Sequence, residues 1–125
     1  MTERGWLIGP GDKALSCDAT GVVVFTRTDL TDADLLEVDW QDDWRGVVRP
    51  VPHQSLCIGA DATPFSPVGV CGQYYGTTNA PGNYELWSFG QWPSGRVEAV
   101  IEYDQQGADH GRAWAAAGLT WVKQS

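Results

Sequence analysis

The chain has very little positive charge. Only two of its 125 residues are lysines, Lys13 and Lys123, and lysine and arginine together number 8 against 16 aspartates and glutamates, which gives a formal net charge of -8. Proteins that bind nucleic acids or anionic membranes do so by placing lysine and arginine against phosphates. The charge balance therefore excludes a general binder of nucleic acid or of anionic membranes.

Long apolar runs are also missing. No stretch approaches the roughly 20 apolar residues that a membrane-spanning helix needs, and the first six residues contain no basic segment that leads into an apolar one. We therefore expect no membrane insertion and no signal peptide. Hydrophobic residues make up 42% of the chain and charged residues 19%, which excludes wholesale disorder and is enough for one folded core.

Metal-binding residues are few and poorly spaced. The three cysteines, Cys17, Cys57 and Cys71, form no C-x-x-C pair, and the two histidines are His53 and His110. Structural zinc sites use closely spaced pairs of ligands, so we expect no metal and no cofactor. Without an export signal the thiols are expected to be reduced and buried, with a Cys57–Cys71 disulfide as the alternative.

Catalytic motifs are absent as well. The chain has no Gly-x-Ser-x-Gly segment and no glycine-rich phosphate-binding loop. Glu98 and Glu102 would lie about 13 Å apart along a strand, which is wider than the ~5–9.5 Å between the carboxylates of glycosidases. We therefore expect no catalytic residues and no enzyme activity. The alternative is a small hydrolase that uses Glu85, Glu98 or His110.

Turn-forming and aromatic residues are abundant instead. The chain contains 15 glycines, 7 prolines and 7 tryptophans, whereas the strong helix formers do not dominate. This composition predicts an all-β fold, a small antiparallel β-sandwich or barrel-like domain with many short strands and at most one short helix.

Local patterns predict individual strands. Residues 21–26 form the strongest β-branched run, which is typical of a strand. Residues 96–103 alternate between apolar and polar side chains, which predicts a half-buried antiparallel strand. Further strands are expected over residues 84–89, 112–115 and 118–123.

Two segments of the N-terminal half predict other structures. Thr31 is a candidate N-cap for a short helix over residues 32–38. Prolines in residues 47–52 predict an edge strand or a linker, because proline cannot donate a hydrogen bond to a neighbouring strand. The loop that follows favours a boundary between an acidic, β-rich part, residues 1–62, and a second β domain, residues 63–125.

Seven aspartates and glutamates lie within residues 29–43, together with Trp40, and Trp44 follows. A calcium site or a contact for a basic partner is one interpretation, but the spacing lacks the central glycine and closing glutamate of a calcium loop. A solvated acidic face anchored by the two tryptophans is the interpretation that the pattern favours.

The aromatic residues of the last 52 positions are the other unusual feature. Tryptophan and tyrosine offer a large contact area with a polar group, which suits interfaces and sugar faces. Trp92 lies in a predicted turn and is the main candidate for ligand binding, together with Tyr74 and Tyr75. A place in the core or in a subunit interface is expected for Trp87, Trp114 and Trp121.

Short motifs follow one another through residues 72–123. They are Gly72-Gln73-Tyr74-Tyr75, Thr78-Asn79-Ala80-Pro81-Gly82, Gly111-Arg112-Ala113-Trp114 and Gly118-Leu119-Thr120-Trp121, with a predicted hairpin between the second and the third. This order resembles the knob-like domain near the C-terminal ends of bacteriophage tail fibres and R-type pyocin fibres. Gly5-Trp6-Leu7-Ile8-Gly9 resembles the segment that precedes such knobs.

The resemblance implies a bacteriophage virion structural protein of the tail-fibre or receptor-binding type, made in the host cytoplasm and located in the virion. It implies no catalytic residues. It also implies a homo-oligomer, with a trimer favoured, that contacts other virion proteins or a glycan on the host cell surface. The alternatives are a capsid decoration or head-spike protein and a stand-alone carbohydrate-binding β-sandwich module.

Overall fold

The structure is a computed structural model that describes residues 2–61, 73–82, 85–91, 97–104 and 112–125. Within these residues there are strands and short 3-10 turns, and no helix is long and apolar enough to cross a membrane. The strands are β1 (Thr2–Ile8), β2 (Ala14–Cys17), β3 (Val23–Arg27), β4 (Leu36–Trp40), β5 (Arg45–Pro50), β6 (Cys57–Asp61), β7 (Gln73–Thr77), β8 (Leu86–Gln91), β9 (Val97–Asp104) and β10 (Arg112–Lys123). The 3-10 turns are η1 (Pro10–Asp12), η2 (Asp32–Asp34) and η3 (Val51–His53). The predicted all-β fold is therefore confirmed.

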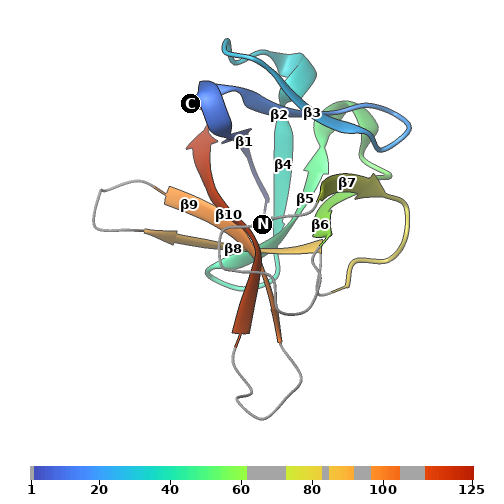
Figure 1. The fold of residues 1–125 in the computed structure, drawn as a ribbon. Helices are drawn as coiled ribbons and strands as arrows, with labels where there is room; N and C mark the ends of the chain where they lie inside the picture. The colour runs from blue at the N-terminus through green and yellow to red at the C-terminus, as the bar shows by residue number, and fades with distance from the viewer. Residues whose placement is uncertain (1, 62–72, 83–84, 92–96, 105–111) are drawn as a thin grey trace.

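Strand β1 closes the main sheet on itself, because it pairs with strands on both of its sides. Its first half pairs antiparallel with β4, and its second half pairs antiparallel with β10 from Gly5 opposite Lys123 to Ile8 opposite Thr120. The order β1-β4-β5-β8-β9-β10 thus forms a closed antiparallel ring of six strands, from which β2 and β3 extend. In Figure 1 the red strand β10 runs beside the blue strand β1. Of the two predicted architectures, this pairing corresponds to the barrel-like one.

Strands β6 and β7 form a separate antiparallel ribbon. An isolated bridge between Val22 and Tyr75 connects the ribbon to the start of β3, and the Gly76 N–H donates to the Gly21 carbonyl at 2.8 Å. Gly21 has a φ of +90°, and a Cβ there would collide with the Gly76 carbonyl oxygen. Glycine is therefore required where the ribbon meets the β2–β3 hairpin.

One hydrophobic core is shared by both parts of the chain. Leu7 and Val48 pack in the same cluster as Trp87 and Trp121. The ring also joins β5 to β8 and β1 to β10, so that its strands come from both sides of the boundary expected at residues 62 and 63. The two expected parts therefore share one sheet and one core within the described residues.

The helix expected over residues 32–38 is wrong. Only the single 3-10 turn η2 forms, and the Thr31 side chain makes no capping hydrogen bond. Strand β4 begins directly afterwards, with Leu36 1% and Val38 0% exposed. Residues two apart share a face in a strand but not in a helix, so burial of this alternating pair favours the strand.

The edge strand or linker expected over residues 47–52 is also wrong, because β5 lies between β4 and β8. The reason lies in the register. Strand β8 pairs only with Arg45 to Val47, whereas Pro50 lies opposite Leu36 of β4, beyond the part of β5 that β8 reaches. The rule that proline avoids central pairing therefore holds at Pro50 itself but not for the whole strand.

The cysteines of the described residues are buried free thiols. Burial raises the pKa of Cys17 to about 11 and also raises the pKa of Cys57. A thiol is nucleophilic only as the thiolate, so the raised pKa values disfavour reaction of these two buried thiols at neutral pH. Cys71 lies outside the described residues.

Candidate functional site

The residues predicted to bind a ligand, Tyr74, Tyr75 and Trp92, are not brought together into one described site. The Tyr74 ring stacks on the Trp87 ring, with 6.3 Å between centroids, and meets the edge of the Phe25 ring at 5.5 Å. Tyr74 is thus engaged in packing against the core. Tyr75 is half-buried on β7 opposite Val22. Trp92 lies outside the described residues.

The tryptophans expected in the core or in an interface lie in the core where the structure describes their side chains. Trp87 is 0% exposed, and its indole N–H donates to the Ile58 carbonyl at 2.9 Å. Trp121 is 6% exposed and donates to Glu3 Oε2 at 2.6 Å. Trp87 has no surface left for a neighbouring subunit, so the interface alternative fails for it. The side chain of Trp114 is outside the described residues.

Among the tryptophans whose side chains the structure describes, Trp44 is the exposed one, and it is 39% exposed at the end of the turn between β4 and β5. Asp42 builds this turn. Its Oδ1 accepts the backbone N–H groups of Trp44 at 3.1 Å and of Arg45 at 2.8 Å, while the Gln41 N–H donates to the Arg45 carbonyl at 2.9 Å. An aspartate that accepts the N–H groups two and three residues later fixes a tight turn without help from the core.

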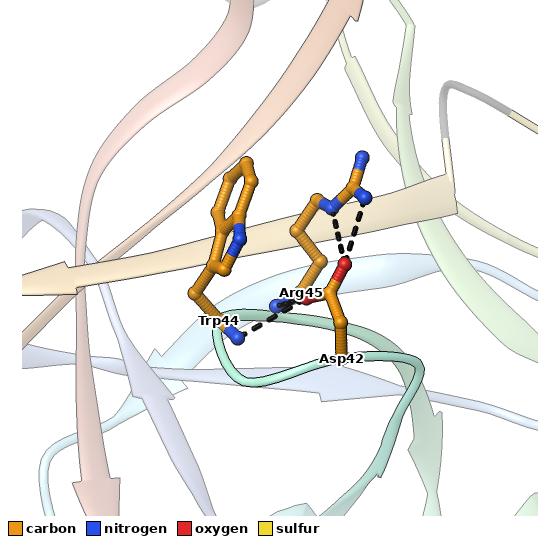
Figure 2. A network of polar contacts seen from close by, with 3 residues as sticks. All are labelled: Asp42, Trp44 and Arg45. Atoms are coloured by element: carbon orange, nitrogen blue, oxygen red, sulfur yellow. Dashed lines mark hydrogen bonds and ion pairs between the residues drawn. The ribbon is translucent and has the colours of Figure 1, made fainter.

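The Trp44 indole packs against the Arg45 side chain, which Asp42 holds in place (Figure 2). The Arg45 guanidinium lies 4.6 Å from the ring centroid, which is a cation–π distance. Asp42 Oδ2 holds that guanidinium by accepting its Nε–H at 2.9 Å and its Nη2–H at 2.7 Å. The Trp44 carbonyl accepts the Phe89 N–H at 2.8 Å, which ties the turn to β8. The backbone and the stacked guanidinium therefore restrict the indole before any ligand arrives.

The same contacts set the charge state of Asp42. Hydrogen bonds from the Arg45 guanidinium lower the pKa of the Asp42 carboxyl, and the backbone N–H groups of Trp44 and Arg45 lower it further, against a smaller opposing effect of desolvation. The ionised carboxylate is the form that accepts all of these bonds. The turn is therefore built around a charged Asp42.

Acid should open this turn only below the usual titration range of aspartate, which is near pH 3.9. A carboxyl whose pKa is lowered by folding stabilises the folded state above its unfolded pKa, and this contribution is lost as the pH falls through the folded pKa. A carbon-13 NMR titration of the Asp42 side chain measures that value. Arg45→Met should raise the pKa towards its usual range but not fully, because the backbone donors remain. A wild-type Asp42 pKa at or above 3.9 would contradict the network.

A cavity of about 390 Å³ opens beside the turn, lined by Glu3, Trp40, Asp42 and Asp43. This volume is within the range of about 300–1,000 Å³ that is usual for small-molecule sites. Trp40 meets the Phe89 ring edge-on at 4.9 Å, so its indole is anchored in the barrel wall. The Asp43 carboxylate makes no hydrogen bond or ion pair with any described residue and faces solvent. The expected anchoring by tryptophan is therefore confirmed for Trp40, whereas Trp44 is a surface residue. The solvated acidic face does not include Asp34, which is 2% exposed and pairs with Arg27.

The side chains that line this site are aromatic rings and carboxylates. Across the described part of the chain, no group of three or more histidines, cysteines, aspartates or glutamates is arranged to hold a metal ion. Of the residues named for a hydrolase, Glu85 is 9% exposed and buried, and the side chains of Glu98 and His110 are outside the described residues. The site instead combines aromatic surface with carboxylate acceptors.

Sequence reasoning missed Trp44 as a contact residue, although a signal was present. Asp42, Asp43 and Trp44 are consecutive turn residues between two strands, and Arg45 begins the second strand. A tryptophan in such a charged turn is a candidate for the surface. No model of a known protein family and no curated protein sequence matches this chain. The function must therefore be argued from the chemistry of the site.

Proposed function

We propose that this chain is a non-catalytic recognition domain of a bacteriophage virion, of the tail-fibre or receptor-binding type. We further propose that residues 41–44, the turn between β4 and β5 that we call the Trp44 turn, contact the host surface. The all-β fold and the resemblance of residues 72–123 to fibre knobs support a virion role. The observation that carries the proposal is an exposed indole held in place by its own turn and by Arg45.

A fixed, exposed tryptophan is well suited to recognition. Immobilising a flexible side chain on binding costs about 0.5–1.5 kcal/mol. The contacts of Trp44 with its turn and with Arg45 already restrict its conformations, so this cost is smaller. Tryptophan and arginine are also enriched among the residues that dominate binding energy. The pair of Trp44 and Arg45 therefore offers rigid contact area where most turn residues offer mobile polar groups.

Replacing Trp44 by alanine should weaken binding to host envelopes by about 30-fold, which corresponds to the ~2 kcal/mol of a dominant contact residue. Sedimentation of fluorescently labelled protein with isolated bacterial envelopes measures the affinity. Val24→Ala is the matched control, because Val24 is 44% exposed on β3 and lies outside the turn. Equal losses in both variants, or no loss in Trp44→Ala, would refute the role of the turn.

The proposed fibre-type domain and the two alternative functions differ in what they assemble with. A fibre-type domain, the form we propose, is a homotrimer that contacts other virion proteins, as the resemblance implies, whereas a stand-alone carbohydrate-binding module has no need to assemble. Light scattering of the purified chain at micromolar concentration separates the two, since a monomer would favour the stand-alone module. A capsid decoration protein would bind purified capsids and leave bacterial envelopes unbound.

A further inference from the structure

The Trp44 turn is held on both flanks by one residue of the neighbouring strand. Phe89 of β8 donates its backbone N–H to the Trp44 carbonyl, at the end of the turn, with a distance of 2.8 Å. The Phe89 ring meets the ring of Trp40, the residue before the turn, edge-on with 4.9 Å between centroids. Edge-to-face contacts stabilise aromatic pairs beyond the area that they bury. Phe89 therefore fixes the position of the turn at its start and at its end.

The Phe89 ring also connects the turn to the last strand. It meets the Trp121 ring of β10 edge-on, with 5.6 Å between centroids. Phe89 and Trp121 are 8% and 6% exposed and belong to the core cluster, and Trp40 packs against this cluster. We call Trp40, Phe89 and Trp121 the aromatic row. Because protein interiors are closely packed, a shift of one ring must be taken up by its neighbours.

Trp121 is in turn held by β1. A Cβ on Gly5 would lie 2.8 Å from the Trp121 ring, so the ring packs directly against the β1 backbone. The Trp121 indole N–H donates to Glu3 Oε2 at 2.6 Å, and Glu3 also lines the cavity beside Asp42. The position of Trp121 therefore depends on the pairing of β1 with β10, which we call the seam.

We infer that Phe89 and Trp121 are positioning residues for the recognition site, because the aromatic row holds the Trp44 turn in its binding conformation while the seam is closed. This inference rests on the proposed function and adds a means of regulating the same site. A load or a partner that parts β1 from β10 would release Trp121 and, through Phe89, loosen the turn. The turn would then bind its ligand more weakly, although no residue of the turn has changed.

Phe89→Leu tests the contact of the row with the turn, because it removes the ring and keeps the backbone N–H that bonds Trp44. The pKa of Asp42, which the Arg45 guanidinium and the N–H groups of Trp44 and Arg45 lower, reports on the turn in the folded protein. Carbon-13 NMR should show this pKa rising towards its usual value. The amides of Trp44 and Arg45 should exchange about 5-fold faster, the lower end of typical coupling between sites.

Phe25→Leu is the matched control, because the Phe25 ring packs against Tyr74 on β7. It lowers stability by the same kind of change but should leave the Asp42 pKa and the two amides as in wild type. An equal response of the turn to both variants, or no response to Phe89→Leu, would overturn the inference.

A double-mutant cycle tests transmission from the seam. Gly5→Ala places a Cβ against the Trp121 ring and should also raise the Asp42 pKa and speed exchange of the turn amides. Combined with Phe89→Leu it should add little to the response of the turn, because the row is already interrupted. Additive responses, or a turn that ignores Gly5→Ala, would refute transmission. Trp121→Phe, which keeps a ring but loses the N–H bond to Glu3, repeats the cycle with a milder change.

Envelope sedimentation separates this inference from the proposed function. Phe89→Leu and Gly5→Ala should each weaken binding by about 5-fold, whereas Phe25→Leu should not. If the turn responds to the first two variants but the wild type does not bind envelopes, the host-contact role fails while the positioning role stands. If Trp44 is needed for binding but neither the turn nor the affinity responds to these variants, the positioning role fails while the host-contact role stands.

Discussion

Replacing Trp87 by alanine should lower the free energy of unfolding by about 3–5 kcal/mol, the usual cost of removing a large buried aromatic side chain. Trp87 is 0% exposed and stacks on Tyr74, and its N–H bond to the Ile58 carbonyl links β8 to β6. Domains of ordinary stability unfold at a cost of about 5–15 kcal/mol. The variant should therefore be partly unfolded at 37 °C or lose most of its stability.

Chemical denaturation followed by circular dichroism measures this change. Trp87→Phe is the control that separates packing from hydrogen bonding. It retains an aromatic ring but leaves the Ile58 carbonyl without its donor, which should cost about 1–3 kcal/mol. A Trp87→Ala variant within 1 kcal/mol of wild type would contradict the fully buried position.

Replacing Gly5 by alanine should open or strain the barrel. Gly5 pairs with Leu36 of β4 and with Lys123 of β10, so it lies where β1 contacts both neighbours. A Cβ at this position would collide with the Val122 carbonyl oxygen and would lie 2.8 Å from the Trp121 ring. Backbone cannot move aside as a flexible side chain can, so we expect a loss of at least about 1–3 kcal/mol.

Gly90→Ala provides the matched control for this substitution. Gly90 also lies in a strand of the ring, but a Cβ there would meet nothing within 4 Å. Its replacement should change stability by less than about 0.5 kcal/mol. Hydrogen exchange should show faster exchange of the β10 amides opposite β1 in Gly5→Ala alone. Equal stability of the two variants would refute a close approach of β10 at Gly5.

Local patterns predicted some of the strands, but they missed β4 and did not predict how the sheet closes. Alternation over residues 96–103 and the β-branched run at 21–26 predicted β9 and β3, because side chains alternate between faces in any strand. Pairing of Gly5 with Lys123 joins residues at opposite ends of the sequence. No local signal encodes such a contact, since its stability comes from the shared core.

For the candidate site, too, the sequence predicted the type of residue but not its position. Composition identified tryptophan as the unusual residue but assigned binding to the last 52 positions. Trp87 and Trp44 have the same side chain, yet one is 0% and the other 39% exposed, because the first lies on the inner face of a strand and the second in a turn closed by Asp42. Exposure of a given indole depends on the register of its neighbours, which a single sequence does not reveal.

The pairing of the first and last strands also determines how the molecule responds to mechanical load. Because β1 and β10 run antiparallel, the start of one lies beside the end of the other, and the Gln124 N–H donates to the Arg4 carbonyl at 2.8 Å. A pulling force applied through the N- and C-termini would break these hydrogen bonds one after another, starting at the termini, instead of loading all of them at once. The barrel therefore yields most easily along this seam, whereas a force applied through one end and the Trp44 turn is shared by several strands.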